Sequence, residues 1–229
     1  MRFAIQNNSR VEATRGARGI CPGCGDDLLA KCGERKIRHW AHKARVHCDP
    51  WWENETEWHR KWKSNFPVEW QEVPIRGQSG ELHIADIKTP NGLVMEFQHS
   101  SISETESAVR EGFYGPMIWV LDGLRLKMDR YTFVEHMTFR ALHNTEFQGT
   151  IRMNPRVPAI TRRWLHSERP IFLDFGEDVL WHISVEMDGW AKKASRIQKS
   201  AFVEYLLDIR ELASSSPFGH LFNPPPQTP

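Results

Sequence analysis

Long apolar runs are absent from this chain of 229 residues. A membrane-spanning helix needs roughly 20 consecutive, mainly apolar residues, and no stretch of the sequence approaches that pattern. The opening segment, MRFAIQNN, also lacks the apolar region of a signal peptide. These absences predict a cytoplasmic protein with no membrane partner.

An excess of charge of one sign is absent as well. The 30 Lys and Arg residues balance 29 Asp and Glu residues, which leaves a formal net charge of +1. This balance does not attract nucleic acid to the protein as a whole, so a DNA-binding surface has to come from local clusters of basic residues. A hydrophobic content of 40% with 26% charged residues is ordinary for a globular protein and excludes a disordered chain.

Cysteine is scarce, and the cysteines that are present cluster. Three of the 4 cysteines fall within Cys21 to Cys32, and without an export signal we expect metal ligands or free thiols rather than disulfides. Cys21 and Cys24 form a closely spaced pair, and His39 and His42 form a second pair with the same spacing. Four such ligands suit a closed tetrahedral Zn²⁺ site with a structural role.

Alternatives stay open at this zinc site. Cys32, His47 or Cys48 could replace one of the histidines, and a turn of buried free thiols would need no metal. Residues 1–50 lack helical periodicity, so they predict a small zinc-ribbon-like β unit. Its basic residues form either a solvated face or a surface for a phosphate backbone: Lys31, Arg35, Lys36, Arg38, Lys43 and Arg45.

The pattern changes at Trp51, where we expect a second domain over residues 51–210. Its predicted elements are a helix over 53–66, strands over 67–74, 81–88 and 93–99, a helix over 104–113 and a strand over 117–121. Further along, the sequence predicts a helix over 131–143, a strand hairpin over 171–175 and 179–185, and a helix over 190–210. Residues 211–229 are expected to be a disordered tail.

The most informative pattern lies on either side of the turn Pro90-Asn91-Gly92. This turn suits a three-residue hairpin loop with glycine in the left-handed conformation, and that register sets Asp86 opposite Glu96. Gln98 shares a sheet face with Glu96, and opposed positions have Cβ atoms roughly 5 Å apart. Two carboxylates at that spacing could hold Mg²⁺ or Mn²⁺ for phosphodiester cleavage. The alternative is an exposed hairpin with two solvated acids.

Several motifs together resemble the competence protein CoiA family of the PD-(D/E)xK nuclease superfamily. They are Met95–Ser103, Glu55-x-x-x-His59-x-x-x-Lys63, the Cys21 to Cys24 pair and His39-Trp40-Ala41-His42. The resemblance covers roughly residues 18 to 122. It implies an α/β fold with a mixed sheet and a restriction-endonuclease-like αβββαβ core.

The resemblance also implies roles for particular residues. Asp86 and Glu96 would bind the catalytic metal, and Gln98 would occupy the position that the wider superfamily usually gives to lysine. A neutral amide can position groups by hydrogen bonds but supplies no cation, so Lys63, Lys88 or His59 would have to supply it.

The helix before the three strands carries two further candidate catalytic residues. Glu55 should face the sheet, where it could deliver an oxygen to the metal or orient a metal-bound water. His59 could contact phosphate as a cation. A helix-surface pair between Glu55 and His59 is the structural alternative.

The leading hypothesis is therefore a magnesium-dependent deoxyribonuclease of CoiA-like type, which would act in DNA uptake, recombination or repair. We expect single-stranded or branched DNA as its partner in preference to plain duplex, together with recombination proteins. One rival is a catalytically inactive, zinc-containing protein that binds DNA and assists recombination. A second rival is an interaction module whose tryptophan-rich helix contacts a protein partner.

Overall fold

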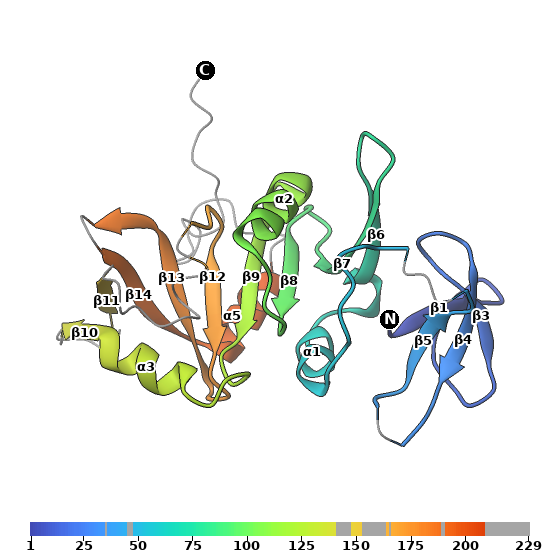
Figure 1. Cartoon of the computed structure of the whole chain (residues 1–229), viewed down its shortest axis with the longest axis horizontal. Coiled ribbons are helices and arrows are strands. Elements are labelled where there is room, and N and C mark those ends of the chain that lie inside the picture. Colours follow the sequence, from blue (N-terminus) through green and yellow to red (C-terminus); the bar gives the residue numbers. More distant parts are fainter. Residues whose placement is uncertain are drawn as a thin grey trace. The chain divides into compact units, whose positions relative to one another are not determined.

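A computed structural model describes residues 1–34, 36–44, 48–140, 148–152, 164, 166–188 and 191–208 (Figure 1). The chain divides into two compact units, Met1–Lys88 and Thr89–Pro229. Both units combine helices with strands, which confirms the mixed α/β class. The tail predicted over 211–229 lies outside the described residues.

The first unit opens with a five-stranded antiparallel sheet, which we call the N-terminal sheet. Its strands lie in the order β2-β1-β3-β4-β5, and their bounds are β1 Phe3–Gln6, β2 Ser9–Glu12, β3 Arg18–Ile20, β4 Asp27–Lys31 and β5 His39–His42. The buried core of this sheet is small and consists of Ala4, Ala13, Cys21, Leu28 and Trp40. A β unit was predicted for this part of the chain, and the structure contains one.

The rest of the first unit carries the helix that the sequence predicts. The elements are α1 Glu57–Lys63, the 3-10 turn η1 Val68–Trp70 and the antiparallel strands β6 Gln71–Arg76 and β7 Leu82–Lys88. Helix α1 starts later than residue 53 because Thr56 caps it, with its side chain accepting a hydrogen bond from the His59 backbone nitrogen. The strand predicted from residue 67 starts only at Gln71, because Pro67 leads into the turn η1.

The strands of the second unit lie in a mixed sheet in the order β10-β11-β14-β13-β12-β9-β8. Its elements are β8 Val94–Gln98, α2 Glu104–Tyr114, β9 Met117–Asp122, α3 Asp129–His136, β10 Met137–Arg140, β11 Gln148–Arg152, β12 Ile171–Asp174, β13 Val179–Asp188, β14 Ala191–Gln198 and α5 Lys199–Leu207. Strand β9 pairs in parallel with both β8 and β12. These three strands therefore end at the same edge of the sheet.

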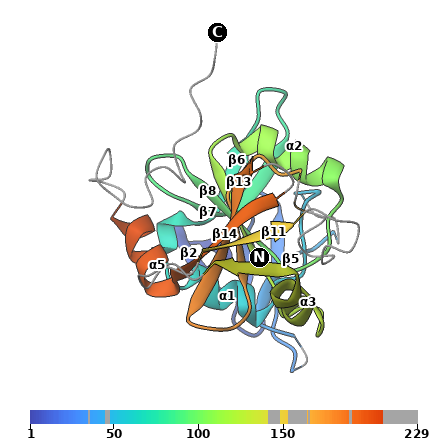
Figure 2. The same cartoon turned by 90° about the vertical axis from the view of Figure 1, so that its left-hand side faces the viewer.

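Helices cover both faces of this sheet (Figure 2). On one face, Phe172 of β12 packs against Phe202 of α5, with ring centroids 4.7 Å apart. On the other face, Trp181 of β13 contacts Phe133 of α3 at 5.5 Å, and the Trp119 indole donates to Glu111 of α2. Alternation along the strands thus supplies apolar side chains to two layers of core.

The helix predicted over 104–113 is confirmed, together with its signals. Ser103 is the N-cap, and its side-chain oxygen accepts a hydrogen bond from Glu106 N at 3.0 Å. Gly115 ends the helix with a φ of 69°, in the region that favours glycine. The tight turn before β8 is also as predicted, since Gly92 has a φ of 91° and Thr89 N donates to Leu93 O.

Two predicted helices are wrong over part of their length. The helix expected over 131–143 ends at His136, and Met137–Arg140 forms β10 instead; residues 141–143 lie outside the described part of the chain. The helix expected over 190–210 starts only at Lys199, because Ala191–Gln198 pairs with β13 and β11 as strand β14. Pairing with strands distant in sequence outweighs the local helical preference of these segments.

Candidate functional site

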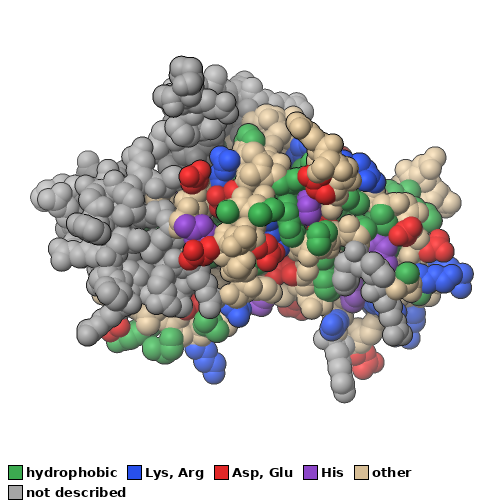
Figure 3. All heavy atoms as spheres, turned by 45° about the horizontal axis from the view of Figure 1, so that its top comes forward, with side chains coloured by type: hydrophobic (Ala, Val, Ile, Leu, Met, Phe, Trp, Pro, Cys, Tyr) green, Lys and Arg blue, Asp and Glu red, His purple; other side chains and the backbone are tan. Residues whose placement is uncertain are grey.

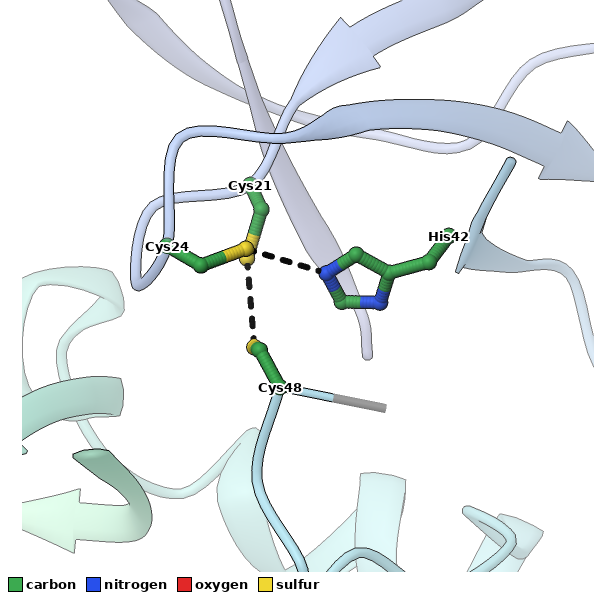
Figure 4. Close-up of side chains that lie close together, drawn as sticks. All are labelled: Cys21, Cys24, His42 and Cys48. Carbon is green, nitrogen blue, oxygen red and sulfur yellow. Dashed lines mark hydrogen bonds between the residues drawn. The ribbon is translucent and has the colours of Figure 1, made fainter. Parts of the chain in front are cut away.

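Four potential metal ligands converge at the edge of the N-terminal sheet (Figure 4). Cys21 and Cys24 come from one tight turn, His42 from the end of β5, and Cys48 from the segment that follows. Their ligand atoms all lie within 4.8 Å of one another. The shortest separations are 3.3 Å between Cys24 Sγ and His42 Nε2, and 3.7 Å between Cys21 Sγ and Cys48 Sγ.

Cys48 takes the place that the sequence analysis gave to His39. His39 and His42 are three residues apart on β5, so their side chains leave opposite faces of the strand and only one can meet the cysteines. The His39 Nδ1 atom instead lies 2.8 Å from the Ile37 carbonyl oxygen. Of the three alternatives left open, Cys48 joins the cluster, Cys32 lies near the Ala13 carbonyl oxygen, and His47 lies outside the described residues.

This Cys₃His cluster fits a tetrahedral metal such as zinc. Three thiols and one imidazole are a ligand set of structural zinc sites, and four protein ligands leave no position for water. Burial and the neighbouring Cys21 and Cys24 thiols raise the pKa of Cys48, so the metal-free thiol holds its proton. Metal binding would release protons, and metal affinity would therefore fall as the pH falls.

Cys48 is positioned by its neighbour Asp49. The buried Asp49 carboxylate accepts a hydrogen bond from Ile84 N at 2.8 Å and lies 2.9 Å from His83 Nδ1. The adjacent Trp51 ring stacks on His83, with centroids 3.2 Å apart. Strand β7 thus fixes the segment that brings the fourth ligand to the cluster.

A second cluster in the first unit surrounds the ammonium group of Lys63, and we call it the Lys63 cluster. Lys63 is 3% exposed. Its Nζ atom lies 2.9 Å from Glu55 Oε1, 3.1 Å from Glu72 Oε1 and 3.4 Å from Asp86 Oδ1. Burial lowers the pKa of Lys63, but the three carboxylates outweigh it, and the net shift is upward. The lysine is therefore a permanent buried cation.

Glu55 is held as a carboxylate in this cluster. Its Oε2 atom accepts from Arg60 Nη2 at 2.9 Å, while Oε1 faces Lys63. Burial raises the pKa of Glu55, but the two cations outweigh this and lower it to about 2. Glu55 precedes α1 and its carboxylate is buried, whereas Glu57 is exposed.

His59 is buried beside the Lys63 cluster, and its ring bridges two partners. Nε2 lies 2.7 Å from Glu53 Oε1, and Nδ1 lies 2.9 Å from Thr56 Oγ1. Burial lowers the pKa of His59, but the Glu53 hydrogen bond and the negative charge of Asp86 outweigh it, so the net shift is upward. The carboxylate that holds the ring is thus Glu53 and not Glu55, which the structural alternative in the sequence analysis had paired with His59.

Glu72 is a functional candidate that sequence reasoning missed. Besides Lys63, its carboxylate accepts hydrogen bonds from the backbone nitrogens of Arg2, at 2.7 Å and 2.8 Å, and Phe3, at 3.1 Å. Its backbone is left-handed, with a φ of 46°, which costs a non-glycine residue roughly 1 kcal/mol. The signal available in the sequence was an acidic residue within the strand predicted over 67–74, and the structure shows that this residue is buried.

In the second unit, Glu96 and Gln98 lie on β8, where every residue is buried. The Glu96 Oε2 atom lies 3.6 Å from Arg110 Nη1 of α2. The Gln98 amide donates to the Ser100 carbonyl oxygen at 2.9 Å. Asp86 belongs to the first unit and Glu96 to the second, so their pairing into one metal site stays a prediction.

Charges of both signs are intermixed among the described residues on the face drawn in Figure 3. This distribution agrees with the net charge of +1. The described members of the predicted basic surface are all exposed, namely Lys31, Lys36, Arg38 and Lys43, while Arg35 and Arg45 lie outside the described residues.

The fold and the cluster define a mixed α/β protein with a Cys₃His site of metal-ligand spacing near its N-terminus. Residues 4–50 match the family model of the competence protein CoiA N-terminal domain. The match spans nearly all of the N-terminal sheet and all four cluster residues. No curated protein and no solved structure matches the chain. No helix among the described residues is long and apolar enough to cross a membrane.

Proposed function

We propose that the protein is a metal-dependent DNA nuclease of CoiA type that processes incoming or recombining DNA. The observation that carries this proposal is the Lys63 cluster. It places a buried lysine 3.4 Å from Asp86, one of the two acids that the sequence assigns to the catalytic metal. Gln98 cannot provide a cation, and Lys63 can supply this charge from another element.

The roles of the residues follow from their charges. Mg²⁺ or Mn²⁺, held by Asp86 and Glu96, would supply a nucleophilic hydroxide and neutralise charge on the phosphate. Lys63 holds the Asp86 carboxylate and adds positive charge beside it. Gln98 positions groups by hydrogen bonds.

Glu55 acts in this proposal through Lys63. Its carboxylate faces Lys63 and Arg60 at 2.9 Å each, so it fixes the lysine beside Asp86. A direct bond from Glu55 to the metal would require it to leave one of these cations. His59, whose pKa is raised, has both ring nitrogens engaged by Glu53 and Thr56, so in this proposal it adds positive charge without contacting the phosphate itself.

Zinc in the Cys₃His cluster would have a structural role. The N-terminal sheet has a small apolar core, so four metal bonds would contribute much of its folding free energy. The sheet would then present its exposed Lys36, Arg38 and Lys43 to a DNA backbone.

A second candidate is a DNA-binding, recombination-assisting protein without turnover. It is favoured by the Arg110 guanidinium, which lies 3.6 Å from Glu96 and can neutralise that acid without any metal. In this case Glu96→Gln would leave the protein's DNA-dependent activity intact.

The test uses labelled single-stranded, duplex and branched DNA of the same sequence, with Mg²⁺, Mn²⁺ or EDTA. Under the nuclease proposal, cleavage requires the divalent metal and is almost abolished by Asp86→Asn, Glu96→Gln and Lys63→Met. Glu57→Gln is the matched control, because Glu57 is an exposed acid on α1 outside the Lys63 cluster.

Binding of DNA without cleavage in every lane would favour the second candidate. Metal-dependent cleavage that survives both Asp86→Asn and Glu96→Gln would place the active site elsewhere. Zinc content is measured after the EDTA incubation. Zinc that stays bound shows that EDTA removed only the catalytic metal, and lost zinc shows that it removed the structural metal as well.

A further inference from the structure

A pocket lies at the sheet edge where β8 and β9 end, within the second unit. Residues that follow these two parallel strands line it, among them His99, Ser100, Asp122 and Arg125. Carboxyl ends of parallel strands are a common place for ligands to bind, because the loops that leave them converge there. Gln98 of the proposed nuclease site lines the same pocket.

The register of the two strands creates a histidine–aspartate pair at this edge. Gln98 of β8 is opposite Leu121 of β9, so the next residues in each chain segment, His99 and Asp122, meet. The His99 Nδ1 atom lies 2.7 Å from Asp122 Oδ2. The other carboxylate oxygen, Oδ1, accepts a hydrogen bond from Leu124 N at 2.9 Å. Asp122 is therefore fixed, and it orients the imidazole.

The exposure of these groups is graded from the sheet outward. The Asp122 side chain is 9% exposed and the His99 side chain is 34% exposed. Arg125 is exposed and follows the end of β9 closely. Asp122 is therefore more buried than His99, and both His99 and Arg125 lie nearer to solvent.

We propose that this pocket binds a phosphate group of a nucleic-acid strand, with His99 and Arg125 as its two hydrogen-bond donors. When the imidazole carries both protons, Nδ1–H donates to Asp122 and Nε2–H can donate to a phosphate oxygen. Arginine presents paired donors that match phosphate oxygens. The phosphate can be a strand terminus or an internal phosphodiester.

This inference deepens the proposed function, on which its choice of ligand rests. The buried Asp129 carboxylate also lines the pocket and opposes an anion. Binding of an anion in this pocket therefore requires His99 and Arg125 together, and the loss of either side chain should weaken binding clearly.

The test measures binding of fluorescent single-stranded oligonucleotides by anisotropy at constant salt with no Mg²⁺ or Mn²⁺ added, so that no cleavage occurs and zinc is not extracted. The zinc-loaded full chain is used after zinc content is verified in each sample. His99→Gln, Asp122→Asn and Arg125→Gln are compared with wild type. Lys127→Gln is the matched control, because Lys127 is an exposed cation close in sequence that is outside the pocket lining.

We expect a loss of about tenfold or more in affinity for His99→Gln and Arg125→Gln, the range of one hydrogen bond to a charged group. The salt dependence of binding should also become shallower by about one phosphate contact. Lys127→Gln should change neither. Equal losses for Arg125→Gln and Lys127→Gln, or no loss for His99→Gln, would overturn the proposal.

Strands with a 5′-phosphate, a 3′-phosphate or neither distinguish the two sources of phosphate. A preference for one phosphorylated end that disappears in Arg125→Gln identifies a terminal phosphate, and equal binding of all three identifies an internal one. As a direct probe, inorganic phosphate should shift the His99 ring-proton resonance in a saturable way, and an unchanged resonance would contradict the pocket.

The two proposals fail separately. If cleavage depends on Glu96 while all three pocket variants keep both cleavage and binding, only the phosphate-pocket proposal is contradicted. Pocket-dependent binding in a protein that never cleaves DNA would remove only the nuclease.

Discussion

The N-terminal sheet and the sheet of the second unit keep their strands together by different means. The N-terminal sheet has short strands, and its buried cluster of described residues combines Trp40 with Leu28, Cys21 and two alanines. The second sheet buries large side chains on both faces, such as Trp119 and Phe172, under helices. The first has a Cys₃His cluster at its edge, and no such cluster is found among the described residues of the second.

The difference shows how a small β unit compensates for missing apolar area. Burial contributes about 25 cal/mol per Å² of apolar surface, so a core with few large side chains supplies little free energy. A structural zinc ion contributes on the order of 10 kcal/mol in small domains. A metal bound by the Cys₃His cluster would therefore substitute for the larger hydrophobic core that the second sheet has.

Metal removal should produce the largest difference in stability between the two sheets. A chelator strong enough to extract zinc should unfold the N-terminal sheet while the second sheet stays folded, because only the first depends on metal–ligand bonds. Hydrogen exchange followed by mass spectrometry checks this, with amides of β1 to β5 losing protection and those of β9 and β12 keeping it. Uniform protection after zinc is gone would show that the cluster does not stabilise the sheet.

Single substitutions in the cluster should sharpen the same contrast. Cys48→Ser should lower zinc affinity by at least about 100-fold, since a primary ligand is lost, whereas His39→Ala should leave the zinc content near one per chain. Competition with a chromophoric chelator measures both. The reverse result would restore the ligand set that spacing alone suggested.

Truncation of a core side chain should destabilise the second sheet and leave the N-terminal sheet unchanged. Phe172 is fully buried and packs on Phe202, so Phe172→Ala should cost about 3–5 kcal/mol of unfolding free energy. Urea denaturation provides the number, and zinc content should be unchanged. A loss below 1 kcal/mol would mean that α5 contributes little to this core.

The smallest effect is expected from pH acting on Glu55. Its pKa is about 2 in the folded chain and close to 4.5 when unfolded, so the carboxylate stabilises the fold above about pH 4.5 and progressively less toward pH 2. The contribution is at most about 3 kcal/mol. Wild type and Glu55→Gln should therefore differ in unfolding free energy at pH 7 and converge at low pH. A constant difference across this range would contradict the ion-pair account.

Much of this architecture follows from local sequence signals. Ser103 with Glu106 predicts the start of α2, and Gly92 predicts the turn before β8, because caps and turns depend on neighbours in sequence. Strand β14 could not be predicted in this way, since pairing with β11 and β13 decides its conformation.

The candidate sites show the same division. Cys21 and Cys24 are recognisable from their spacing, whereas Cys48 reaches them only because Asp49 binds strand β7. The exclusion of His39 follows from the alternation of side chains along a β-strand, but it could be deduced only if residues 39–42 were predicted as a strand, and the sequence analysis predicted no individual strands there. The Lys63 cluster joins a helix to two strands, and no spacing rule relates these positions.

The carboxylate of Glu72 has a consequence for the order in which the chain is made. It binds the backbone of Arg2 and Phe3, which precede it by 70 and 69 residues. During synthesis on a ribosome, β1 leaves the exit tunnel long before this acid does. Strand β1 is therefore made well before its anchor, and a nascent chain that stalls before residue 72 would expose β1 to chaperones and proteases.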